Sequence, residues 1–140
     1  MASIRKEMLV EAEPESIWEA IRDVGAVHRR LAPGFVVDCR LEEDGAARVV
    51  TFANGLVARE LIVDVDDATR RLVWSVVDGR PTHHNGSLQV FADGDGRSRV
   101  VWIADLLPND LAGPIGGMME QGMRAMQQTL EGANRAGAAA

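Results

Sequence analysis

Residues 54–79 read NGLVARELIVDVDDATRRLVWSVVDG, and this stretch decides the fold class of the chain. Asn54–Gly55 is a strong signal for a two-residue hairpin turn, because both residues accept a positive φ. Two strand-like runs follow at 56–65 and 72–77, and only the polar run 66–70 separates them. Parallel strands need a crossover of about a dozen residues or more. The stretch therefore predicts an antiparallel meander.

The alternation of apolar and polar residues continues on both sides of this stretch. Turn signals recur along it, among them Asp44–Gly45, Asp78–Gly79 and the run DGDG at 93–96. The further predicted strands span residues 3–11, 35–42, 47–52, 83–91 and 97–107. Together with the central pair they predict seven strands in one antiparallel sheet.

Two parts of the chain change to helical periodicity. Pro14 begins an apolar stripe that predicts a short helix over 13–23, and 26–31 predicts a second short helical segment. After the last strand, residues 110–133 carry apolar side chains at intervals of three or four. This stripe comprises Ile115, Met119, Met123, Met126 and Leu130. A helix of this length spans about 30 Å, which is enough to lie across the whole sheet.

The composition fits one α+β domain, which we expect over residues 1–135, with 136–140 as a frayed tail. Fifteen basic residues against 21 acidic ones give a net charge of −6, which disfavours nucleic acid as a partner. The single Cys39 rules out an internal disulfide, and no apolar run predicts a signal peptide or a membrane span, so we expect a cytoplasmic protein. His83–His84 is a poor metal pair, because neighbouring strand residues point to opposite faces. We predict no metal and no cofactor.

A family resemblance follows from the order and spacing of four segments. EAEPESIWEAIRDVGAVHRRLAPG at 11–34 follows the first strand, and THHNGSLQVFADGDGRSRVVWIADLLP at 82–108 precedes the last helix. Together with 54–79 and that helix, they resemble the START/Bet v 1-like (SRPBCC) superfamily, in particular its bacterial polyketide cyclase/dehydrase-like group. The resemblance covers essentially the full length. It implies a helix-grip fold, in which a curved seven-stranded sheet wraps around the C-terminal helix and leaves a cavity between them.

The parity of each strand predicts which side chains point into that cavity. Trp74 and Trp102 fall on apolar faces and should point inward, and His84 shares a face with neighbouring apolar residues. Arg59 falls on the face of Val57 and Val65 by the same count. The hypothesis is that His84 and Arg59 are the polar groups of an otherwise apolar pocket.

Less functional interpretations of both polar residues stay open. The charged head of Arg59 can extend to solvent near a strand end, and His84 can be a core histidine bonded to a backbone carbonyl. A slip of one residue in this strand would turn Glu60 inward in place of Arg59.

Methionines dominate the stripe of the last helix. Met119, Met123 and Met126, with neighbouring Met118, carry flexible thioether side chains that adapt to varied apolar ligands. They are therefore candidate ligand contacts. The alternative is that they form a packing face only, as a stripe at helical spacing usually does.

Two functions from different classes remain. The first is binding or carriage of a small hydrophobic molecule in the cavity between the sheet and the last helix, by a monomer or a homodimer. The second is a polyketide cyclase or dehydratase that uses His84 as its proton-transfer group. The chain has no tyrosine, and no paired carboxylates are evident on the inward faces, so few general acids are on offer. A cavity filled by side chains, in a protein that acts through its surface, is a third option.

Overall fold

The computed structural model describes residues 1–139 and contains one seven-stranded sheet. Its strands are β1 (Ala2–Val10), β2 (Val36–Glu42), β3 (Ala47–Phe52), β4 (Val57–Asp66), β5 (Arg71–Val76), β6 (His83–Ala92) and β7 (Ser98–Leu107). Their order across the sheet is β1-β7-β6-β5-β4-β3-β2. Every neighbouring pair is antiparallel, which confirms the meander predicted from residues 54–79.

Short helical segments follow β1, and a long helix ends the described chain. These are α1 (Pro14–Arg22), the π-helical segment η1 (Val27–Leu31) and α2 (Ala112–Ala139), with 3-10 turns η2 (Glu43–Gly45) and η3 (Asn109–Leu111). Helix α2 extends beyond the predicted end at residue 133. The frayed tail at 136–140 stays a prediction, and its last residue lies outside the described part.

Helix α1 covers one end of the sheet and seals the core there. Pro14 occupies the start of the helix, where a missing N–H is tolerated. Ile17, Trp18 and Ile21 are almost fully buried. The indole Nε1 of Trp18 donates to Oδ1 of Asp67 at 2.8 Å, which ties α1 to the turn between β4 and β5.

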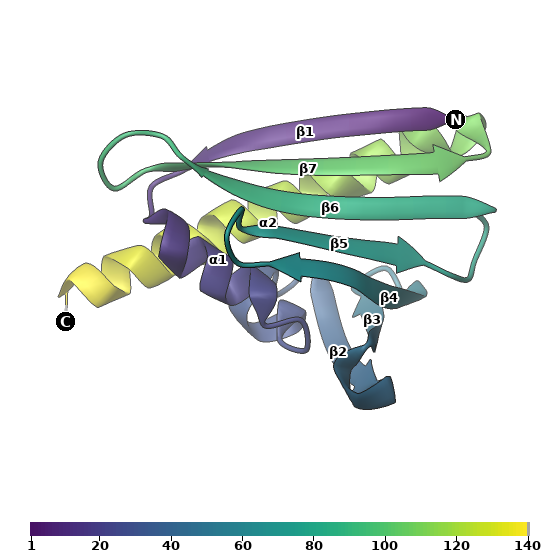
Figure 1. Cartoon of the computed structure of the whole chain (residues 1–140), viewed down its shortest axis with the longest axis horizontal. Helices are drawn as coiled ribbons and strands as arrows, with labels where there is room; N and C mark the ends of the chain where they lie inside the picture. The colour runs from purple at the N-terminus through teal and green to yellow at the C-terminus, as the bar shows by residue number, and fades with distance from the viewer. Residues whose placement is uncertain (140) are drawn as a thin grey trace.

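Helix α2 runs along the concave face of the sheet and is fixed at one edge (Figure 1). Lys6 on β1 forms an ion pair with Glu120 at 2.9 Å, and Gln127 donates to the carbonyl of Leu9 at 2.9 Å. In Figure 1 the strands from β5 to β2 turn progressively away from the direction of β1 and β7. The sheet therefore lies close to α2 along β1, and the strands toward β2 diverge from the helix.

The hairpin between β3 and β4 corrects two details of the sequence prediction. Its loop holds three residues and not two, because the N–H of Phe52 donates to the carbonyl of Leu56 at 2.8 Å. A register shift between Ile62 and Asp64 then marks a β-bulge in β4. Strand alternation counted back from Val65 places Arg59 on the inward face. The bulge lies between these two residues and shifts the alternation by one residue, so the predicted inward orientation of Arg59 is wrong.

Candidate functional site

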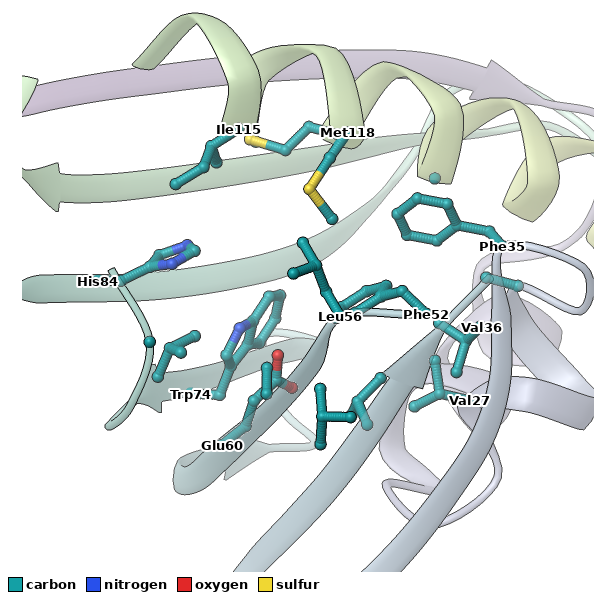
Figure 2. A pocket seen from close by; sticks show the side chains of 18 of the residues that line it. Val27, Phe35, Val36, Phe52, Leu56, Glu60, Trp74, His84, Ile115 and Met118 are labelled. Atoms are coloured by element: carbon teal, nitrogen blue, oxygen red, sulfur yellow. The ribbon is translucent and has the colours of Figure 1, made fainter. Parts of the chain in front are cut away.

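A cavity of about 260 Å³ lies between α2, η1 and the concave face of the sheet (Figure 2). Side chains from both layers point into it: Glu60, Trp74 and His84 come from the sheet, and Ile115 and Met118 come from α2. Most of the wall is apolar. Its apolar residues include Val27, Leu31, Phe35, Val36, Val50, Phe52, Leu56, Val76, Leu88, Leu111 and Met126.

Two tryptophans form part of the wall. The rings of Trp74 and Trp102 lie 6.3 Å apart between centroids, at an interplanar angle of 57°. Gly86, which pairs with Trp74 across β5 and β6, makes room for the indole, because a Cβ there would lie 2.8 Å from Nε1 of Trp74. Gly122 on α2 plays the same part for Trp102, whose Cζ3 would lie 2.8 Å from an added Cβ. The predicted inward orientation of both tryptophans is confirmed, and their contact with a ligand stays a prediction.

His84 lines the cavity from β6, near the segment that connects β5 to β6. Burial lowers the pKa of His84 from its ordinary value of 6.5, and the charge of His83 lowers it further. A lowered pKa keeps the imidazole neutral near pH 7, where it can both donate and accept a hydrogen bond. The side chain points inward as predicted from strand parity, while its role toward a ligand stays a prediction.

The methionines of α2 divide between the cavity and the core. Met119 and Met126 line the cavity, and so does Met118. Met123 is 7% exposed and belongs to the hydrophobic core, outside the residues that line the cavity. Three methionines of α2 therefore border the cavity while Met123 packs in the core, and contact of any of them with a ligand stays a prediction.

The cavity wall contains a buried ion pair between Arg48 and Glu60, whereas the sequence predicted Arg59 and His84 as the polar groups of the pocket. Nε of Arg48 donates to Oε1 of Glu60 at 2.8 Å, and the two side chains are only 6% and 9% exposed. Both residues line the cavity. Arg48 also donates from Nη1 to the carbonyl of Val24 at 3.3 Å, and its guanidinium lies 5.5 Å from the ring centre of Trp74. The three-residue loop sets Arg48 directly opposite Glu60, and a correct loop length would have predicted this pair.

Arg59 lies outside the cavity wall. Its guanidinium donates from Nε to Glu42 at 3.2 Å and from Nη2 to Glu43 at 2.9 Å. These two hydrogen bonds hold the side chain at the outer surface, so Arg59 does not supply a polar group to the pocket. Glu60 takes the inward position, as the one-residue slip would have it.

The described residues offer little for metal chemistry. Within residues 1–139, no group of three or more His, Cys, Asp or Glu side chains is placed to hold a metal ion. Burial raises the pKa of the Cys39 thiol, which disfavours the reactive thiolate. No helix in the same part of the chain is long and apolar enough to cross a membrane.

A sheet that wraps around a C-terminal helix over an internal cavity defines the class of helix-grip proteins. The match of a family model over residues 1–136 makes the assignment specific: the chain belongs to the family described as polyketide cyclase / dehydrase and lipid transport. Among proteins with curated descriptions, none matches the chain.

Several solved structures share this fold. The protein XoxI from Bacillus cereus superposes with a TM-score of 0.83 at 21% identity, over 93% of this chain and 96% of that one. A START superfamily protein from Mycobacterium smegmatis gives 0.70 at 15% identity, over 95% and 97%. The di-domain ARO/CYC protein BexL of the BE-7585A biosynthetic pathway gives 0.81 at 14% identity, over 94% of this chain and 47% of that one. At these identities the likeness shows the fold.

Proposed function

We propose that this protein binds and carries a small hydrophobic molecule in the cavity between the sheet and α2. The observation that carries the proposal is the cavity itself: about 260 Å³ of space inside a mostly apolar wall, with few polar side chains. Small-molecule sites have this composition, in which apolar surface supplies affinity and a few polar groups orient the ligand. The net charge of −6 also favours a small molecule over a nucleic acid as the partner.

Comparison with other proteins supports the same proposal, through the family description and one structural neighbour. The family description joins polyketide cyclases and dehydrases with lipid transport, and BexL is an ARO/CYC protein. Lipids are largely apolar molecules. Binding is the part of the function that carriers and cyclases have in common, so it is the part that we propose.

The alternative is a cyclase or dehydratase with His84 as the proton-transfer group. A neutral imidazole is competent to accept a proton. The inward carboxylate of Glu60, however, already accepts a hydrogen bond from Arg48 at 2.8 Å, so within residues 1–139 the cavity holds no unengaged carboxylate on its buried wall to act beside His84. The proposal therefore stays with binding.

The test is to incubate the purified protein with a metabolite extract and to identify co-purifying molecules by native mass spectrometry. We expect an apolar molecule at one copy per cavity, recovered unchanged; a chemically altered product would support catalysis instead. Ala58 lines the cavity, so Ala58→Phe places a bulky side chain in the space for the ligand and should abolish retention of the bound molecule. Val63→Phe on the same strand is the matched control, since Val63 is 58% exposed and outside the wall. Equal retention by both variants would contradict the assigned site.

A further inference from the structure

The cavity wall has a specific charge arrangement. Its only ionisable side chains within residues 1–139 are Arg48, Glu60, Asp78, Arg80 and His84. Asp78 and Arg80 are exposed, so water screens their charges. Arg48 and Glu60 are more than nine-tenths buried and neutralise one another. The buried part of the cavity therefore contains two full charges whose sum is zero.

We propose that the Arg48–Glu60 pair makes the cavity selective for neutral ligands that carry a hydroxyl or amide group, against carboxylates of the same length. This inference rests on the proposed function and names the class of ligand. It concerns the polar end of the molecule, while the apolar wall accounts for the remainder.

The pair can accept a neutral polar group without being broken. A carboxylate accepts up to about four hydrogen bonds, and Arg48 supplies the one at Oε1 of Glu60. The guanidinium has five N–H donors, of which Nε and Nη1 already bond to Glu60 and to the Val24 carbonyl. A hydroxyl or an amide can donate to Glu60 and accept from Arg48 at the same time. Each of its polar atoms then recovers a partner for the water it loses.

A carboxylate ligand meets the opposite situation. Bound at Arg48, it places a second negative charge beside Glu60 in a region shielded from water, where like charges repel strongly. Drawing Arg48 away would leave Glu60 as an uncompensated buried charge. Arg48 is also held by Val24 and by the face of Trp74, so it is not free to follow the ligand. The neutral His84 adds no positive charge that would offset the repulsion.

The experiment compares octanol, octanamide and octanoate at neutral pH, where octanoate is ionised. Each displaces the neutral fluorophore N-phenylnaphthylamine from the wild-type protein, from Glu60→Gln and from Glu42→Gln. Glu42 is the matched control, because its carboxylate pairs with Arg59 away from the cavity. For wild type and Glu42→Gln we expect octanol and octanamide to bind about tenfold more tightly than octanoate or better. In Glu60→Gln, which leaves Arg48 with an unbalanced positive charge, octanoate should gain about tenfold or more.

Two results would overturn the inference: octanoate binding as tightly as octanol to wild type, or no gain for octanoate in Glu60→Gln. Should Glu60→Gln fail to fold, Arg48→Met with Glu60→Met replaces the whole pair by apolar side chains. Octanamide should then lose about tenfold in affinity while the fluorophore keeps its own, and undiminished octanamide binding would contradict us. If the fluorophore does not bind the wild-type protein, the proposed function is refuted and the inference falls with it. If the fluorophore binds but octanol and octanoate compete equally well, only the inference is refuted.

Discussion

Removal of one partner from the buried ion pair gives the sharpest prediction for stability. Arg48→Met keeps most of the side-chain volume and removes the charge that faces Glu60 at 2.8 Å. Because both side chains are less than one-tenth exposed, bulk solvent does not reach Glu60, and a water molecule in the cavity would supply a hydrogen bond but not the lost positive charge. Leaving a buried charge uncompensated costs about 3–5 kcal/mol. A domain is stable by only about 5–15 kcal/mol, so the loss should be plainly measurable.

Urea unfolding followed by tryptophan fluorescence measures this free energy of unfolding. Arg59→Met is the matched control, because its ion pairs with Glu42 and Glu43 are partly exposed to water, which screens them, so their loss should cost much less than the loss of a buried pair. The double variant Arg48→Met with Glu60→Met should recover most of the loss, since it removes both buried charges. A cost for Arg48→Met no larger than that for Arg59→Met would refute the assignment of a buried, mutually dependent pair.

Further predictions concern packing, the helix and the titration of the cavity. Gly86→Ala should lower the unfolding free energy by about 1–3 kcal/mol, because the new methyl group collides with Trp74, and thermal unfolding measures it. Gly117→Ala, an exposed helical position with nothing within 4 Å of an added Cβ, should instead raise it by about 1 kcal/mol; a shared sign would contradict the packing description. Because burial lowers the pKa of His84, the unfolded chain takes up a proton while folded His84 stays neutral, so stability should fall as pH drops through 6.5. That fall should be smaller in His84→Gln, and identical pH profiles from parallel urea titrations would count against the shift.

Local periodicity was sufficient to predict the elements of this fold. Apart from the irregularities in β2 and β4, each strand alternates over its own length, and the stripe of α2 repeats at helical spacing, so neither needs knowledge of distant contacts. The inward tryptophans followed for the same reason. Trp74 and Trp102 lie in strands whose parity is uninterrupted around them.

The polar part of the site depended on features that periodicity does not encode. One additional residue in the loop at Asn54–Gly55 sets the register of β3 against β4, and a bulge near Val63 inverts the parity of the strand beyond it. A shift of one residue exchanges Arg59 for Glu60 on the concave face. Helical spacing correctly placed Met123 on the buried face of α2. It could not show which residues of that face border the cavity, because the position of the cavity depends on the curvature of the sheet.

The three tryptophans allow a direct test of the central claim that small apolar molecules occupy the cavity. Their indole N–H signals are separately observable by NMR in protein labelled with nitrogen-15. Trp74 and Trp102 line the cavity, whereas the indole of Trp18 donates to Asp67 outside it. Addition of octanol should shift the Trp74 and Trp102 signals in a saturable manner and leave that of Trp18 in place. Unchanged Trp74 and Trp102 signals at saturating octanol, or equal shifts of all three, would contradict the claim.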